Sequence, residues 1–344
     1  MLPVLALTIL IAPVALDVTP VGFEKAIEPQ IAIDHDHRAY IAYGMGNQLY
    51  LSTLGKGEKE FDRPTKVADF PNLMVGMRRG PRIAISGGTI VIAAVDSGMD
   101  GALRAYRSTN NGKSWQGPVT VNDQQGSARE GLMGLASAPN GTIACVWLDG
   151  RLRGTRLYYS ESRDMGATWS RNRLVYQSPS GSICECCHPT IAFDSKNRAW
   201  IMFRNSLDGN RDMYLVGPDA QSAMRLGRDS WKLSACPMDG GMLAFNRDGE
   251  VRAIWRRESN VYLSGSGENE TLIGPGKQPW IASDTKGFIA VWMDGNRILS
   301  ARPGGDVQEL SANGNDPVVC ASPDGKLVLA SWAEGGIRAS VLSD

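Results

Sequence analysis

Two short segments of the sequence concentrate residues that bind metal ions. The first reads Cys-Glu-Cys-Cys-His over residues 184–188, and the second reads Cys-Pro-Met over residues 236–238. Thiolate, imidazole and thioether groups form a soft ligand set of the kind that selects Cu(I) or Zn(II). The sequence therefore predicts a copper or zinc site, with the candidate ligands Cys184, Cys186, Cys187, His188, Cys236 and Met238.

Disulfide bonds among the same cysteines are the interpretation favoured in an exported protein, unpaired thiols are a third, and the sequence leaves all three open. Neighbouring Cα atoms lie about 3.8 Å apart, which is shorter than the usual disulfide span of about 4.4 to 6.8 Å, so a Cys186–Cys187 bond is unfavourable. A bond from Cys236 to the first segment is easier. The remaining cysteines, Cys145 and Cys320, lie in apolar stretches and are expected to be inert core residues.

Arginine residues beside carboxylates form the second chemical pattern. A guanidinium group binds a carboxylate, sulfate or phosphate through a planar bidentate fork, so grouped arginines predict a small anionic ligand. The candidate ligand-binding residues are Arg78, Arg151, Arg204, Arg211, Arg256 and Asp239. Glu130 and Asp149 are the carboxylates best placed for acid–base catalysis. The alternative is a structural role, with the arginines neutralised by Asp208, Asp212 and Glu258.

An internal repeat indicates the fold that positions these residues. An apolar strand, a polar turn and a second apolar strand recur from starts near residues 29, 81, 133, 189, 241, 279 and 317, about 38 to 56 residues apart. This period is typical of propeller blades. We expect an all-β fold with a single β-propeller of about seven four-stranded blades. Because the last repeat holds three strands, the segment from Leu16 to Gly22 is expected to supply the fourth and close the ring.

Propeller topology predicts where the chemical residues meet. The links between blades and the loops between second and third strands lie on one face, around the mouth of the central channel. Both cysteine segments fall in consecutive links, and most of the arginines fall in such loops. The two groups are therefore expected to lie close together at one channel mouth.

Two repeats carry a sharper motif between their third and fourth strands. Residues 108–115 and 162–169 both fit S-x-D/N-x-G-x-x-W, in which the Asp or Asn caps the turn and the Gly takes a positive φ. The motif resembles the Asp-box, or BNR repeat, of the sialidase superfamily. That resemblance implies a structural role for the motif itself. It further implies an arginine triad that holds a sugar carboxylate, with hydrolysis by a Tyr–Glu pair and an Asp. Sialidases resemble six-bladed propellers, so six blades are the alternative count.

Three further motifs make the sequence similar to a subgroup of Asp-box proteins. They are C-x-C-C-x-P at residues 184–189, C-P-M-D-G-G at residues 236–241 and R-N-x-x-x-G-x-R-D at residues 204–212. This resemblance covers most of the chain and implies the fold and family, without a specific activity. The leading function is therefore binding or hydrolysis of an acidic glycan at the arginine-lined mouth, for which no cofactor is required. The alternative is a metal-binding or redox propeller without glycosidase activity.

Charge and hydropathy narrow the setting in which the protein acts. Lys and Arg number 36 and Asp and Glu number 36, so no global positive field attracts nucleic acid. Residues 1–16 are apolar and uncharged, which favours a signal peptide and a secreted or periplasmic protein, with a buried terminal strand as the alternative. The propeller is then expected to occupy residues 17–344, and no segment of that part is apolar enough to span a membrane.

Overall fold

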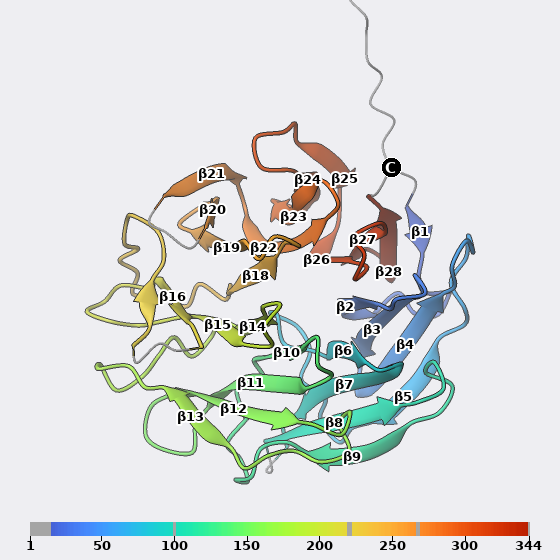
Figure 1. Ribbon diagram of the computed structural model, residues 1–344, viewed down its shortest axis with the longest axis horizontal. Coiled ribbons are helices and arrows are strands. Elements are labelled where there is room, and N and C mark those ends of the chain that lie inside the picture. Colours follow the sequence, from blue (N-terminus) through green and yellow to red (C-terminus); the bar gives the residue numbers. More distant parts are fainter. Residues whose placement is uncertain (1–14, 99–100, 219–221, 266–268, 343–344) are drawn as a thin grey trace, which may run out of the picture.

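A computed structural model describes residues 15–98, 101–218, 222–265 and 269–342. Within these residues the strands form seven four-stranded antiparallel sheets arranged as blades around a central axis (Figure 1). The seven-bladed β-propeller predicted from the repeat is confirmed, and the six-bladed alternative is wrong. Most of the predicted signal segment, residues 1–14, lies outside the described residues.

The strands fall into four positions, counted from the axis outward. The innermost strands are β2 (Ile27–Ile33), β6 (Arg82–Ser86), β10 (Met133–Ser137), β14 (Thr190–Phe193), β18 (Gly241–Phe245), β22 (Lys277–Asp284) and β26 (Asn315–Ala321). The second strands are β3 (Ala39–Met45), β7 (Thr89–Asp96), β11 (Ile143–Asp149), β15 (Ala199–Arg204), β19 (Val251–Arg257), β23 (Gly287–Asp294) and β27 (Val328–Ala333). The third strands are β4 (Gln48–Leu54), β8 (Ala102–Ser108), β12 (Arg156–Ser162), β16 (Met213–Val216), β20 (Asn260–Ser264), β24 (Arg297–Ala301) and β28 (Ile337–Val341). The outermost strands are β5 (Thr65–Asp69), β9 (Gln116–Thr120), β13 (Arg173–Tyr176), β17 (Met224–Arg225), β21 (Glu270–Pro275), β25 (Gln308–Ser311) and β1 (Leu16–Asp17).

This strand order gives the ring two different faces. Each innermost strand begins at the face that carries the links between blades, such as residues 177–189 and 226–240, and we call this the link face. Each innermost strand ends at the opposite face, which carries turns such as residues 34–38 and 138–142 and which we call the turn face. The predicted cysteine segments therefore both lie on the link face.

The seventh blade is closed by the N-terminal strand, as the sequence predicts. Leu16 of β1 pairs with Ala339 of β28, and the Val18 N–H donates to the carbonyl of Ile337 over 2.9 Å. Val18 is buried in the apolar cluster shared by the first and last blades. The closure covers the edge of β28, which would otherwise present unpaired backbone groups.

The two S-x-D/N-x-G-x-x-W segments form turns that bond to themselves. Ser162 Oγ accepts from the Gly166 N–H at 2.7 Å, and Asp164 Oδ1 accepts from the Thr168 N–H at 2.9 Å. Ser108 and Asn110 repeat both bonds at 2.9 and 3.0 Å. These turns lie on the turn face, between β8 and β9 and between β12 and β13, away from the cysteine segments. No helix among the described residues is long and apolar enough to cross a bilayer.

Replacing Val18 with Ala is expected to lower the free energy of unfolding by about 2 kcal/mol, because two buried methyl groups leave a cavity where the ring closes. Val18 is 2% exposed, whereas Val21 in the same segment is 96% exposed. Urea unfolding of Val18→Ala, with Val21→Ala as the matched control, measures the difference. Equal stability of both variants would show that the closing segment contributes nothing.

Candidate functional site

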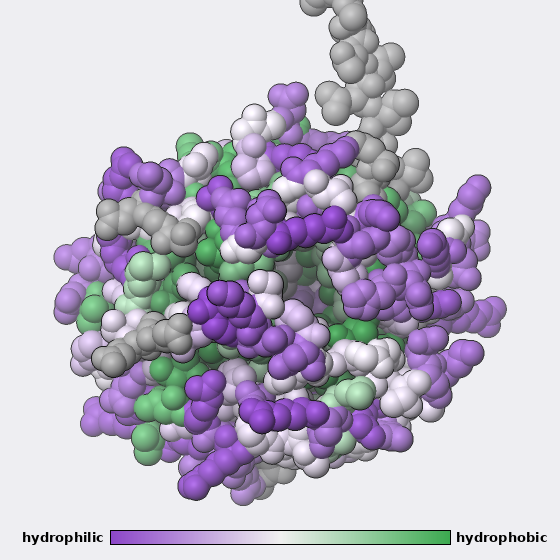
Figure 2. All heavy atoms as spheres, in the orientation of Figure 1, coloured by the Kyte–Doolittle hydropathy of each residue, from purple (hydrophilic) through white to green (hydrophobic). Residues whose placement is uncertain are grey.

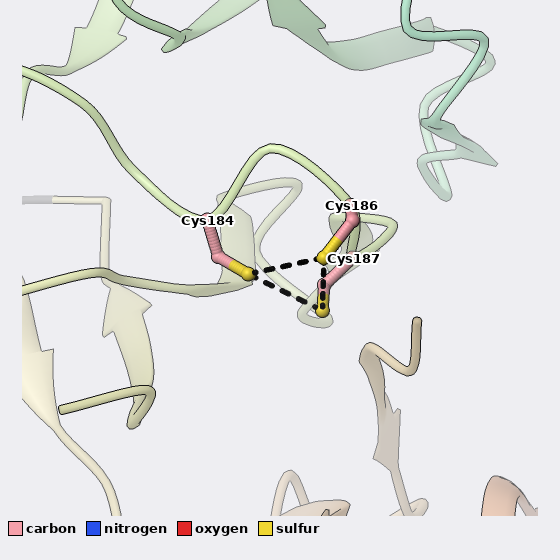
Figure 3. Close-up of side chains that lie close together, drawn as sticks. All are labelled: Cys184, Cys186 and Cys187. Carbon is pink, nitrogen blue, oxygen red and sulfur yellow. Dashed lines mark hydrogen bonds between the residues drawn. The ribbon is translucent and has the colours of Figure 1, made fainter. Parts of the chain in front are cut away.

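Three cysteines of the link before β14 form a compact buried cluster (Figure 3). The Sγ atom of Cys184 lies 3.7 Å from that of Cys186 and 3.5 Å from that of Cys187, and the last two are 4.0 Å apart. All three residues are buried and all three thiols are free. Within the described part of the chain, these are the His, Cys, Asp and Glu side chains whose ligand atoms gather closely enough to hold one metal ion.

The second cysteine segment reaches the cluster through two residues. Met238 packs against the three buried cysteines. Cys236 is exposed, and its thiol is hydrogen-bonded to Cys186, which helps to raise the pKa of Cys186. The two segments that the sequence assigns to one site therefore do meet.

His188 belongs to a different environment although it follows Cys187 directly. Its ring stacks on Trp280, with ring centroids 5.6 Å apart and planes inclined by 23°. Its ring nitrogens do not belong to the group of ligand atoms formed by the three sulfurs. The structure thus separates His188 from the sulfur cluster.

The cluster is electrostatically asymmetric. Hydrogen bonding with Cys186 and Cys187 holds the pKa of Cys184 well below its usual range, and the nearby Arg204 lowers it further. The pKa of Cys186 is raised to about 12, chiefly by Cys184, and burial raises that of Cys187 well above its usual value. One thiolate at Cys184, shared by two thiols, is the state these contacts favour.

Arg204 is the residue that ties the cluster to its surroundings. Its carbonyl accepts the Cys184 N–H at 3.1 Å. Its guanidinium is 1% exposed and donates to the carbonyls of Asp239, Arg211 and Arg256 at 3.1, 2.6 and 2.8 Å. The sequence predicts that the Arg204 guanidinium holds a ligand, but in the structure this group donates to the backbone of three segments instead.

Arg78 is likewise engaged inside the protein. Its guanidinium donates to the carbonyls of Gln278 and Pro317 at 2.9 and 3.0 Å and lies 5.1 Å from the ring centroid of Trp280. The side chain is buried, and its backbone N–H donates to Glu28 at 2.7 Å. Arg78 therefore spans the propeller axis from the first inter-blade link to the sixth and seventh blades.

Arg256 and Arg211 are the predicted arginines left closer to solvent. Arg256 donates to the carbonyls of Glu258 and Pro237, and its Nη1 lies 3.9 Å from Asp239. The Arg211 side chain is half-buried and, in the region that the structure covers, has no side-chain hydrogen bond or ion pair. These two guanidinium groups retain donors for an anion on the link face.

Asp239 is buried, and burial raises its pKa. Its Oδ2 accepts the Gln278 N–H at 2.7 Å, and its Oδ1 has no hydrogen-bond partner among the described atoms.

The two predicted catalytic carboxylates occupy contrasting positions. Asp149 is buried and accepts from Trp147 Nε1 at 2.8 Å and from Arg151 Nε at 2.9 Å. Glu130 is half-buried, and burial together with the nearby Glu185 raises its pKa. Arg151 also bonds Asp123 and Asn172, so the Asp149–Arg151 pair is part of a network between two blades.

A group of polar residues near the axis was not predicted from the sequence. Glu28, Gln278 and Asp316 are each the second residue of an innermost strand, and a proline follows each of them. Each of the three has a φ of 54° to 56°. Glu28 is fully buried, with a pKa raised to about 8 by burial. One feature of the sequence could have identified these residues. The dipeptide X-Pro recurs at the start of several innermost strands, so the X residues occupy equivalent positions in their blades.

Replacing Asp149 with Ala is expected to lower the free energy of unfolding by about 3 kcal/mol or more, because the charge of Arg151 then loses its buried partner. Asp123→Ala is the matched control, since Asp123 bonds the same guanidinium from an exposed position and should cost less than about 1 kcal/mol. Urea unfolding compares the two. A loss at Asp123 as large as that at Asp149 would contradict the structural role.

No known family's sequence profile matches this chain, and no curated protein matches its sequence. Solved structures do match its fold. A catalytically inactive variant of virginiamycin B lyase from Staphylococcus aureus, with quinupristin, is 13% identical with a TM-score of 0.59 over 95% of this chain and 98% of that chain. An ulvan lyase bound to a glucuronic acid–sulfated rhamnose unit is 12% identical, with a TM-score of 0.57 over 96% and 94%. An α-L-arabinofuranosidase from Fusarium graminearum is 13% identical, with a TM-score of 0.52 over 97% and 98%. At these identities the likeness shows the propeller fold, and the neighbours that share it include glycan-acting enzymes.

Proposed function

We propose that the protein binds a soft metal ion, Cu(I) or Zn(II), through Cys184, Cys186 and Cys187. The spacing of the three sulfur atoms carries the proposal. A metal–sulfur bond of about 2.3 Å in tetrahedral geometry separates two ligand sulfurs by about 3.8 Å. The observed separations of 3.5, 3.7 and 4.0 Å straddle that value. A disulfide requires a sulfur–sulfur distance of about 2.05 Å, a little over half of these separations.

The fourth ligand comes from the second cysteine segment. Cys236 contacts Cys186 and offers a fourth thiolate, which would complete the tetrahedral set preferred by Zn(II). Met238 packs on the cluster and offers a thioether, which suits Cu(I) better. His188 is left out of this ligand set because its ring stacks on Trp280.

The charge around the cluster supports a bound cation. Three thiolates and a divalent ion carry a net charge of −1, from 3 × (−1) + 2, and a buried charge needs a partner. Arg204 is close enough to lower the pKa values of both Cys184 and Cys187. Its guanidinium has no carboxylate within ion-pair distance among the described residues. A metal–thiolate centre would supply the negative partner of Arg204.

Protein that is reduced and then loaded with Zn(II) or Cu(I) is expected to hold about one metal ion per chain. The Cys184→Ser variant is expected to lose stoichiometric binding, because it lacks one of the three sulfur ligands. Elemental analysis after desalting measures this. Co(II) substitution adds a spectroscopic readout, since thiolate-to-cobalt charge-transfer bands report sulfur ligation. Cys320→Ser, a change in the distant strand β26, is the matched control and should keep the metal. A wild-type chain that takes up neither metal, or whose Cys184 is found in a disulfide, would contradict the proposal.

Binding of an acidic glycan on the link face is the second candidate function. Its support is the glycan-acting character of several fold neighbours, one of which holds a glucuronic acid unit. On this chain, Arg211 and Arg256 retain donors for a sugar carboxylate, and the raised pKa of Glu130 suits a general acid for hydrolysis.

Under this second function, the double variant Arg211→Ala/Arg256→Ala is expected to weaken binding of a glucuronic acid-containing oligosaccharide by about 1.5–3 kcal/mol, the range of a charged hydrogen bond. Calorimetry on wild type and variant measures the change. Arg163→Ala is the control, because Arg163 is an exposed arginine of a turn-face hairpin. Equal affinity for the oligosaccharide and for its neutral, carboxyl-reduced form would rule out recognition of the acid.

A further inference from the structure

The central channel of the ring is a cavity that the three clustered cysteines do not line. It has a volume of about 990 Å³ and is lined by the innermost strands of all seven blades. One end lies among the turn-face residues Asp34 and Asp36, and the other is bounded by Arg82, His188 and Trp280. Figure 2 shows a hollow near the centre of the visible face, with hydrophobic side chains inside it. A cavity of this size is large enough for a small organic molecule.

Arg82 places an unpaired positive charge at the closed end of the channel. The side chain is 5% exposed, and its guanidinium donates to the carbonyls of Pro81 and Arg78 at 2.8 and 3.0 Å. Among the described residues no carboxylate lies within ion-pair distance of it. Glu28 is near, but its pKa of about 8 leaves it largely protonated at neutral pH. A buried guanidinium without a counter-ion is costly, so the position favours an anion.

His188 adds an unused hydrogen-bonding group at the same end. It is 2% exposed, and neither ring nitrogen has a protein partner in hydrogen-bonding geometry. Nδ1 faces the backbone of Gly240, where a Cβ would stand 2.7 Å away. An imidazole nitrogen without a protein partner is free to hydrogen-bond a carboxylate in the channel.

Part of the channel wall is apolar, beside polar residues such as Gln30 and Thr190. Ile31, Ile85, Leu135 and Met242 line it and are only half-buried, so their side chains face the lumen. An anion lodged at Arg82 would therefore have apolar surface beside it along the length of the channel. A ligand that matches both features has a charged end and an apolar body.

We propose that the channel binds a small carboxylic acid with an apolar body, its carboxylate held by Arg82 and His188 and its body lying along Leu135 and Met242. A carboxylate matches the single guanidinium charge and the bidentate geometry of Arg82. A phosphate dianion would bring a second negative charge and has no apolar body to lie along the channel. This site opens toward the turn face, and none of its proposed ligand-binding side chains is a proposed metal ligand, although His188 follows Cys187 in the chain.

Isothermal titration calorimetry of the intact protein with octanoate tests the proposal. Octanol carries the same chain without the charge, and inorganic phosphate carries charge without the chain. Octanoate is expected to bind at least about tenfold more tightly than either probe, as for a charge-assisted hydrogen bond. Equal binding of octanoate and octanol, tighter binding of phosphate, or no binding of octanoate would overturn the proposal.

Two variants locate the ligand. Arg82→Gln should lower octanoate affinity at least about tenfold and leave octanol unchanged. Because Arg82 is buried and the variant is at risk of misfolding, Leu135→Trp provides a second test that changes no charge and fills the lumen. Leu152→Trp, at an exposed loop position, is its matched control. Unchanged octanoate binding in folded Leu135→Trp would place the ligand outside the channel. The Cys184→Ser variant should bind octanoate with the affinity of the wild type. Octanoate binding is thereby tested separately from metal binding.

Discussion

The guanidinium of Arg204 is the contact on which the link face depends. It donates to carbonyls of three separate segments, and its own carbonyl receives the Cys184 N–H. These bonds fix the cysteine segment, the segment around Asp239 and two loops between second and third strands in one arrangement. Its charge also lowers the pKa of Cys184. Arg204 therefore ties the sulfur cluster to the backbone of the link face.

The fold could be read from the sequence because it is repetitive. Each repeat carries its own apolar strand pair and turn. A repeat whose pattern is ambiguous can therefore be interpreted by comparison with the other repeats. The three-stranded last repeat likewise required a fourth strand, which β1 supplies. The meeting of the two cysteine segments also followed from topology, since consecutive links of a propeller share one face.

The roles of individual arginines could not be read in the same way. Sequence spacing places Arg204 and Arg78 near the axis but does not tell whether a guanidinium faces solvent or backbone carbonyls. The difference is decided by carbonyls contributed by distant residues such as Asp239 and Pro317. His188 was assigned to the cysteines because it adjoins them, but the turn and bend at residues 185–187 leave its ring stacked on Trp280 instead.

The pairing of β1 with β28 links residues that are 323 positions apart, from 339 − 16. Among the strands of the ring, β1 leaves the ribosome first and its partner β28 leaves last. The ring thus cannot close until all of its strands have emerged, and contacts this distant in sequence slow folding. The same pairing brings the two ends of the ring together. A circular permutant that joins them and opens a surface loop elsewhere would hold all four strands of the seventh blade in one continuous stretch of chain, and the ring would then close through a different blade.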